Sequence, residues 1–261
     1  MFFRIYALHS IIVLLCVGAS PAPGVAASAV SDRPAVLSHN LAVELLPATH
    51  ELIGQDQTDI ELPIRATTVL FSIAPTVKID RIVLKSQLEP SADSYSETAL
   101  AFTTEQIAQP PAQRVTVTLP AVHDGRVTLA WTYRGTIDDP PKEPRHLRFV
   151  TPSETAGHIG PEGVYLSGES QWYPDIEGSL STYRLRVLVP QGWSVVTQGR
   201  KTEDATDKAR ASSTWVVSDP SEALTLVANK FVTKSRSWKS RNGQQIELAT
   251  YFFPDNAGLA D

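Results

Sequence analysis

The sequence predicts an all-β protein, an antiparallel or mixed β-sandwich with little helix. Several runs alternate apolar and polar residues with the period of two of a half-buried strand, most clearly Val-Thr-Leu-Ala-Trp-Thr-Tyr at residues 127–133. Prolines and glycines separate these runs, as turns do. No stretch keeps a period of 3.6 residues between capping residues, so we expect little helix.

The expected strands follow one another at short intervals in the first half of the chain. Residues 41–46 alternate until Pro47 ends them, and residues 53–62 return after a polar turn, which predicts a hairpin. Two β-branched runs follow at residues 67–73 and 77–84, so we expect four strands before residue 90. Further strands are expected at residues 99–103, 115–119 and 127–133. Trp131 lies on the apolar face of the last run and is predicted to be core.

Residues 138–161 interrupt the strand pattern. This stretch contains five prolines and two histidines, and a connection of this length without periodicity is usually mobile or functional. Residues 183–189 then alternate up to a turn at Pro190, and a second strand ends at Gly199, so the two are interpreted as a hairpin. The remaining strands are expected at residues 214–217, 224–232 and 246–253.

Three segments in chain order resemble the N-terminal domain of the aminopeptidase N family of zinc metallopeptidases. Trp-x-Pro at residues 172–174 is followed by a strand, by Pro-x-Gly-Trp at 190–193 and by Val-Val-x-x-Gly at 195–199. Residues 39–60 are similar to the family's first hairpin, with Gly54 in the place of its turn-flanking glycine, and residues 224–253 to its closing strands. The resemblance implies a saddle-shaped β-sandwich that covers a separate, thermolysin-like catalytic domain.

The chain divides into four expected regions. Residues 1–27 are predicted to be a signal peptide, since Arg4 precedes a short apolar run and then small residues, with cleavage after Ala27 preferred to cleavage after Ala29. Residues 28–38 are expected to be a linker, 39–254 the β-sandwich, and 255–261 the start of a linker to a catalytic domain absent from this chain. We therefore expect a periplasmic or secreted protein without a membrane span after signal removal.

Composition narrows the class of partner. Hydrophobic residues make up 42% and charged residues 20% of the chain, which suits a protein that buries a core. The formal net charge is -5 and no cluster of Lys and Arg stands out, so no nucleic-acid partner is expected. Cys16 is the only cysteine and lies in the predicted signal peptide, so the mature chain would contain no disulfide.

Catalytic machinery is not recognisable in the sequence. The resembling family uses a His-Glu-x-x-His helix for zinc, and the nearest match here is residues 50–54, where Gly54 stands in place of the second histidine. We therefore expect no catalytic residue, no metal ligand and no cofactor in this chain, and place the zinc of the family in the absent catalytic domain. His146 and His158 are interpreted as solvent-exposed or hydrogen-bonded bystanders.

Glu169 and Gln171 are the candidate substrate-binding residues. In the resembling family, an acidic or amide side chain just ahead of the proline-containing segment receives the free α-ammonium of the substrate. A carboxylate suits this role because a charge-assisted hydrogen bond is stronger than a neutral one. The segment at residues 168–174 is shorter than the family pattern, so the alternative is that both are loop residues near a domain interface. Trp172 and Tyr173 are expected to pack rather than to bind ligand.

Two functions from different classes follow. The first is a non-catalytic domain of an exported aminopeptidase N-like protein, which caps a peptide site and helps to bind the substrate N-terminus. The alternative is a stand-alone exported β-sandwich that binds a peptide, a glycan or a protein partner. A domain separated from its catalytic partner should expose a contiguous apolar patch, whereas a self-sufficient binding module should show a bounded groove.

Overall fold

A mixed nine-stranded sheet forms the larger part of the fold. The computed structural model describes residues 33–87, 95–140, 155–243 and 245–255. The strands of this sheet are β1 (Ala35–Leu46), β2 (Glu51–Ile73), β3 (Val77–Gln87), β4 (Tyr95–Ala99), β5 (Ala101–Ala108), β6 (Pro111–Thr136), β9 (Ser181–Pro190), β11 (Arg200–Thr206) and β12 (Arg210–Ser221). Their order is β11-β12-β9-β1-β2-β6-β3-β4, with β5 also paired to β6. The sheet is mixed because β1 and β9 run parallel.

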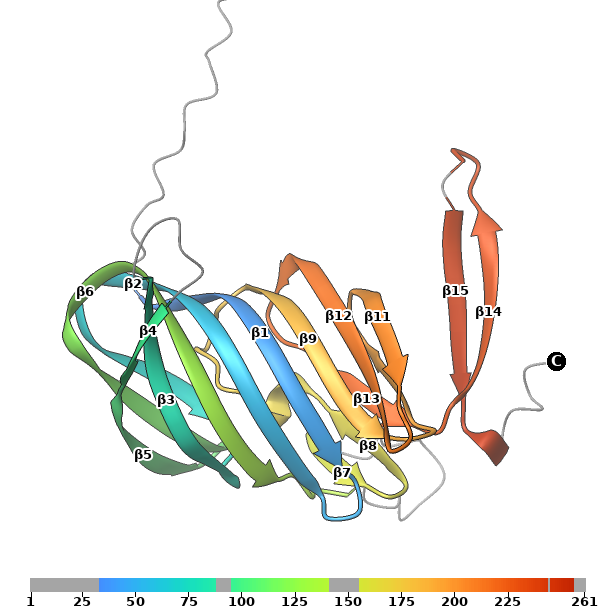
Figure 1. Cartoon of the computed structure of the whole chain (residues 1–261), viewed down its shortest axis with the longest axis horizontal. Helices are drawn as coiled ribbons and strands as arrows, with labels where there is room; N and C mark the ends of the chain where they lie inside the picture. Colours follow the sequence, from blue (N-terminus) through green and yellow to red (C-terminus); the bar gives the residue numbers. More distant parts are fainter. Residues whose placement is uncertain (1–32, 88–94, 141–154, 244, 256–261) are drawn as a thin grey trace, which may run out of the picture.

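A smaller sheet covers part of the large one. Its strands are β7 (Gly157–Gly160), β8 (Gly163–Leu166), β10 (Ser194–Thr197) and β13 (Leu226–Asn229), in the order β10-β13-β8-β7. It lies beneath β1, β9 and β12 (Figure 1). A short 3-10 helix, η1 (Gly168–Ser170), follows β8. The two sheets confirm the predicted all-β fold, and within the described residues no helix could span a membrane.

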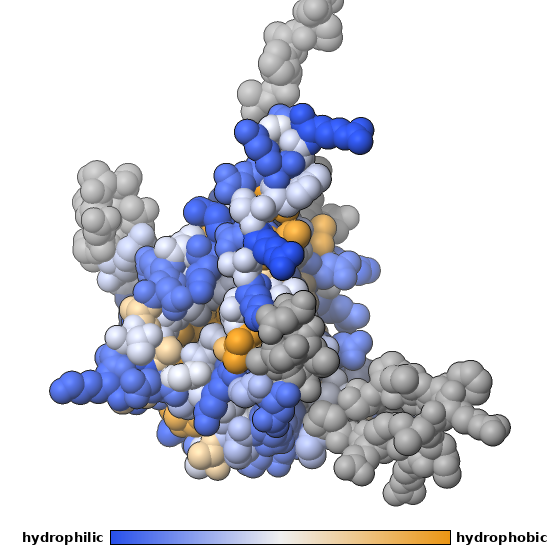
Figure 2. Space-filling model, turned by 90° about the vertical axis from the view of Figure 1, so that its right-hand side faces the viewer, coloured by the Kyte–Doolittle hydropathy of each residue, from blue (hydrophilic) through white to orange (hydrophobic). Residues whose placement is uncertain are grey.

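A separate hairpin ends the described chain. Strands β14 (Val232–Lys239) and β15 (Gln245–Phe252) pair with each other and with no other described strand. The hairpin stands away from the two sheets (Figure 1). Viewed from its side, the molecule shows apolar surface as separate patches between polar residues (Figure 2).

Alternating side chains from the strands build the core. Tyr183, Leu185, Val187 and Val189 of β9 are all at most 2% exposed, as their period of two predicts. Trp131 of β6 is 1% exposed, which confirms its predicted core position. Its ring packs edge-to-face on Phe71 with the ring centres 4.7 Å apart, a favoured geometry for aromatic pairs.

The strands before residue 90 are fewer and longer than predicted. Strand β2 has 23 residues and includes both runs that the sequence separated, and β6 likewise has 26 residues. Prolines led to the division, but Pro63 falls in an irregularity where the β2–β6 register shifts between Leu62 and Ala66. Arg65 adopts a positive φ of 63° there, and the two strands resume pairing afterwards. A bulge thus absorbs the proline without ending the strand.

The expected hairpin of residues 183–199 is wrong, whereas the first hairpin is confirmed. Strand β1 pairs with β2 as predicted, although it begins at Ala35 and so takes in the last residues of the expected linker. Strand β9 pairs with β1 and β12, and β10 pairs with β13 in the other sheet. The turn after Pro190 therefore moves the chain from one sheet to the other. Trp193 is buried at this crossing, with its backbone N–H donating to the Pro190 carbonyl at 3.1 Å.

Gly54 lies inside β2 rather than beside a turn. It pairs with Tyr133 of β6, and a Cβ at this position would collide with the Tyr133 ring. Tyr133 is fully buried, so its ring has little room to move. The glycine is therefore required by the packing of this ring.

Gly54→Ala should lower the free energy of unfolding by about 1–3 kcal/mol, because the added methyl group overpacks the core. Urea unfolding of the variant and of the original chain measures this loss. On a Tyr133→Leu background the ring is gone and the same change should cost clearly less. An equal cost on both backgrounds would contradict this account of Gly54.

Candidate functional site

The loop that carries the two candidate residues is held by a chain of backbone contacts. The hydroxyl and the N–H of Ser167 both donate to the Ala156 carbonyl, at 2.8 and 3.0 Å. The hydroxyl and the N–H of Ser170 in turn donate to the Ser167 carbonyl, at 2.7 and 3.2 Å. Gln171 ends η1 in a left-handed conformation with φ of 49°. The candidate residues are thus on a fixed turn.

Gln171 has its backbone anchored and its side-chain oxygen unpaired. Its N–H donates to the Gly168 carbonyl at 3.1 Å, and its carbonyl accepts the N–H of Ala74 at 2.7 Å. Its Oε1 atom is buried and has no hydrogen-bond partner. A buried carbonyl-type oxygen without a donor costs free energy, which the side chain would recover by turning toward a ligand that supplies an N–H group. Glu169, two residues earlier, is exposed.

Both candidate residues line one hollow at the end of the large sheet. Its volume is about 750 Å³, within the range of small-molecule sites. Prolines and small residues make up most of its wall, and three carboxylates, those of Asp138, Asp139 and Glu169, complete it. No Lys or Arg is among the described residues that line the hollow. Such a wall favours a cationic ligand with an apolar part.

Trp172 and Tyr173 fix the loop to the core, as expected of packing residues. They are 0% and 3% exposed. The indole N–H of Trp172 donates to the Leu224 carbonyl at 3.4 Å, and the Leu224 N–H donates to the Tyr173 hydroxyl oxygen at 3.1 Å. The two aromatic residues therefore join the loop to the segment that enters β13.

A buried charge cluster anchors the far end of the same loop. His39 of β1 lies 2.7 Å from the Asp56 carboxylate through Nδ1 and 3.6 Å from the Asp175 carboxylate through Nε2. The imidazole stacks on Tyr183 at 5.1 Å. Burial by itself would lower the pKa of His39, but the two carboxylates outweigh it and raise the pKa to about 9. His39 is therefore a buried cation at neutral pH.

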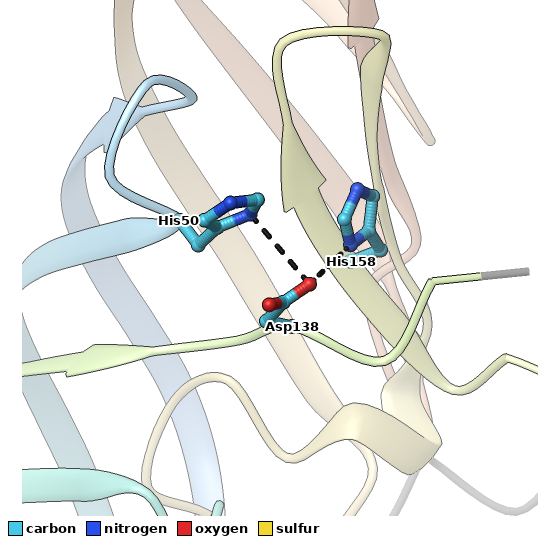
Figure 3. A group of neighbouring side chains, drawn as sticks. All are labelled: His50, Asp138 and His158. Atoms are coloured by element: carbon cyan, nitrogen blue, oxygen red, sulfur yellow. Dashed lines mark ion pairs between the residues drawn. The ribbon is translucent and has the colours of Figure 1, made fainter.

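A second histidine cluster brings together residues that the sequence separates widely. Asp138 lies between His50 and His158, and one of its oxygens points at both rings (Figure 3). Asp138 Oδ1 is 3.1 Å from His158 Nδ1 and 3.6 Å from His50 Nδ1. The sequence indicates that His158 is either solvent-exposed or hydrogen-bonded. The structure shows that it is hydrogen-bonded and buried. His146 lies outside the described residues. No local spacing signals this cluster, because its members belong to three different segments.

The fold is that of part of the M1 zinc metallopeptidases, consistent with their N-terminal domain. A mutant of the M1 zinc metallopeptidase of Deinococcus radiodurans matches with a TM-score of 0.62 and 16% identity over 83% of this chain and 47% of that chain. The same mutant bound to a Tyr-Ser-Ala substrate gives 0.61 and 16% over the same shares. A two-domain M1 zinc metallopeptidase mutant bound to L-tryptophan gives 0.59 and 15%, over 84% and 48%.

These matches confirm the fold that the resemblance implied. The chain spans about half the length of the structures it matches. No protein-family profile matches the chain, and no curated protein matches it in sequence. The zinc-binding His-Glu-x-x-His motif occurs nowhere in the 261 residues, and the nearest segment, 50–54, is a turn leading into β2. The residues present do not fit the catalytic zinc of that family, and no hydrolytic step is assigned to them.

The stability of the chain should fall as the pH rises through the pKa of His39. The folded state holds this pKa at about 9, above its ordinary value of 6.5. The charged cluster therefore contributes its full stability below pH 6.5 and loses it as the pH rises through 9. Urea unfolding from pH 6 to 10 should show a loss of up to about 3 kcal/mol from this group.

Asp56→Asn should flatten this pH dependence and destabilise the chain near pH 6.5. The neutral amide in place of the Asp56 carboxylate no longer offsets the charge of the buried His39 imidazolium, which is then poorly compensated. Asp204→Asn removes an exposed carboxylate and should keep the slope of the original chain. A flat profile in the original chain, or equal slopes in both variants, would count against a charged His39.

Proposed function

We propose that the chain is the non-catalytic N-terminal domain of an exported, aminopeptidase N-like zinc metallopeptidase. Its role is to cap the peptide site and to bind the substrate N-terminus through Glu169 and Gln171. The observation that carries this proposal is the acidic hollow, in which an exposed carboxylate stands two residues from a buried, unpaired amide oxygen. Export, to the periplasm or the medium, rests on the signal peptide that residues 1–27 predict.

A free α-ammonium group matches this hollow. It carries a positive charge and three N–H donors, so it can bond to the exposed Glu169 carboxylate. It would also reach Gln171 Oε1 once that side chain turns its buried oxygen toward the hollow. The apolar part of the wall suits the first side chain of a peptide. The structurally similar metallopeptidases were solved with a Tyr-Ser-Ala substrate, with L-tryptophan and with L-arginine. An amino acid or a peptide with an unblocked N-terminus offers this ammonium group.

The β14–β15 hairpin supports a missing catalytic domain. Val232 pairs with Phe252, Trp238 with Ile246, and Leu248 with Arg236, and residues directly opposite in an antiparallel pair share a face. One face of the hairpin therefore carries five apolar side chains together with Lys234, Arg236 and Thr250. Trp238 and Leu248 are 53% and 56% exposed on it. An isolated two-stranded hairpin is only marginally stable in water. These exposed apolar side chains suit a protein partner, which we assign to the catalytic domain.

The second candidate is a stand-alone exported binding module for a peptide, a glycan or a protein partner. It is favoured by the separate, rather than continuous, apolar patches on the hairpin side (Figure 2). The two candidates differ in what the hollow binds. Only the aminopeptidase N-like domain is required to distinguish a peptide with a free N-terminus from one with a blocked N-terminus.

The chain should bind the peptide Tyr-Ser-Ala more tightly than its N-acetylated form. Acetylation removes the ammonium charge, so Glu169 has no cation to accept from. Glu169→Gln should weaken binding of the free peptide by about fivefold to tenfold, the effect of one partly solvated charge-assisted hydrogen bond. NMR titration measures these dissociation constants, since it detects the weak binding expected of a chain that forms only part of the peptide site.

Glu247→Gln is the matched control, since it makes the same change of charge on an exposed residue of the outlying hairpin. This variant should bind the free peptide like the original chain. Equal binding of the free and the acetylated peptide would rule out recognition of the N-terminus. Binding of a glycan but of neither peptide would favour the stand-alone module.

The backbone amides of β14 and β15 should exchange with deuterium at least about 100-fold faster than those of β1, β2 and β6. The hairpin has only its own two strands to protect it, whereas the central strands are paired on both sides. Hydrogen exchange followed by mass spectrometry on the chain alone measures this difference. Equal protection in the hairpin and in the central strands would mean that the hairpin needs no partner.

A further inference from the structure

Three segments converge at the edge where the two sheets meet. His50 lies in the turn between β1 and β2, Asp138 follows the end of β6, and His158 is in β7. Backbone bonds hold these segments together: the Ile137 N–H donates to the His50 carbonyl at 3.0 Å, and the Ile159 N–H donates to the Ile137 carbonyl at 2.9 Å. The side chains are therefore brought together by a fixed backbone (Figure 3).

The spacing of the side-chain atoms is that of ligands around a metal ion. One nitrogen from each histidine and one Asp138 oxygen all lie within 4.8 Å of one another. A tetrahedral zinc site with bonds of about 2.0–2.1 Å has ligand atoms about 3.3 Å apart. The two separations at Asp138 Oδ1, 3.1 and 3.6 Å, lie on either side of this value. The Asp138 oxygen therefore has both histidine nitrogens at about the separations that a zinc site requires.

His158 presents a buried nitrogen without a hydrogen-bond partner to the centre of the cluster. Its Nε2 atom lies 2.5 Å from the Glu162 carboxylate and donates to it. Its Nδ1 atom is buried, has no hydrogen-bond partner and is directed at Asp138, and the side chain is only 6% exposed. A histidine that donates one N–H to a carboxylate and offers the other nitrogen is the usual arrangement of a metal ligand. A lone pair and a carboxylate oxygen 3.1 Å apart repel each other unless a proton or a metal ion lies between them.

His50 completes the set from a strained backbone position. Its φ is 58°, a value that residues other than glycine seldom adopt. Its Nδ1 atom donates to the Ile159 carbonyl at 2.6 Å. To bind a metal ion through Nδ1, the imidazole would have to turn away from this carbonyl and carry its proton on the other ring nitrogen. The His50 and Asp138 side chains are 34% and 44% exposed, which leaves a path for entry.

We propose that His50, Asp138 and His158 bind one divalent transition-metal ion of the zinc type, with Glu162 orienting His158. Two imidazoles and one carboxylate are ligands that suit zinc and disfavour calcium and magnesium, which prefer oxygen. The ion would join the β1–β2 turn and the end of β6, in the large sheet, to β7 in the small one. It would thus hold the two layers together.

The test is calorimetric titration of the purified, chelator-treated chain with ZnCl₂, together with thermal unfolding. One Zn²⁺ should bind per chain, and Zn²⁺ at 100 times its dissociation constant should raise the Tm by about 5–10 °C. Ca²⁺ and Mg²⁺ should produce no comparable shift. Asp138→Asn and Asp139→Asn form a matched pair, since they remove the same charge from adjacent residues and only Asp138 belongs to the cluster.

Asp138→Asn should weaken Zn²⁺ binding at least about tenfold, whereas Asp139→Asn should bind like the original chain. Glu162→Gln should reduce affinity by about 10-fold or more while leaving the chain folded, since this side chain is largely exposed. Circular dichroism checks that each variant is folded. The proposal is overturned if no saturable 1:1 binding is seen, if both aspartate variants bind alike, or if Ca²⁺ raises the Tm more than Zn²⁺ does.

Discussion

The buried ion pair between His39 and Asp56 is the interaction on which the arrangement of the candidate site depends. It joins β1 to β2 at the centre of the large sheet. Through its other nitrogen the same imidazole faces Asp175, whose backbone pairs with Ser72 of β2 by two hydrogen bonds of 2.8 and 3.0 Å. A buried charge is tolerated only when such partners surround it. The loop that carries Glu169 and Gln171 is therefore tied to the sheet at a place where a misplaced chain would leave a buried charge unpaired.

The other end of this loop is held by hydrogen bonds and aromatic packing. Ser167 is bonded to Ala156, and Trp172 and Tyr173 are bonded to Leu224. These contacts hold the loop, and Gln171 Oε1 has no hydrogen-bond partner within it. A well-anchored loop with an unpaired polar atom is typical of a binding site, because a ligand can supply the missing bond. Packing and hydrogen bonds thus fix the position of the loop, and the unpaired Gln171 oxygen marks the candidate site on it.

Much of the fold could be predicted from local pattern, and the failures share one cause. Alternation placed the strands and the buried face of β9, and identified Trp131 as core. The predicted partner of β10 was wrong because the sequence of the turn after Pro190 is the same whether the chain stays in one sheet or crosses to another. The continuation of β2 past Pro63 was missed because a bulge depends on the facing strand. Each miss concerns pairing between distant residues, which no local period records.

The candidate sites divide in the same way. Glu169 and Gln171 were chosen through a resemblance to a family and lie together on one hollow, although this alone does not test their role. The cluster of His50, Asp138 and His158 had no signal in the sequence, because a turn, a strand end and a short strand supply one residue each. Gly54, which argued against a zinc helix at His50, is required for an unrelated reason, the Tyr133 ring. The absence of one motif therefore says little about ligands assembled from separate strands.

Asp138 belongs both to the histidine cluster and to the acidic hollow, which makes the two proposals interdependent. An ion held by Asp138 would neutralise one of the three carboxylates that attract an ammonium group to the hollow. The ion would therefore lower the affinity of the hollow for an ammonium group. By thermodynamic linkage, a bound ammonium group would lower the affinity for the ion by the same factor. Solvent reduces this electrostatic effect, since Asp138 is 44% exposed. The rigidity that the ion would give to the junction acts in the opposite direction, because Asp138, Asp139 and Gly157 line the hollow and would be held in place when the two sheets are joined.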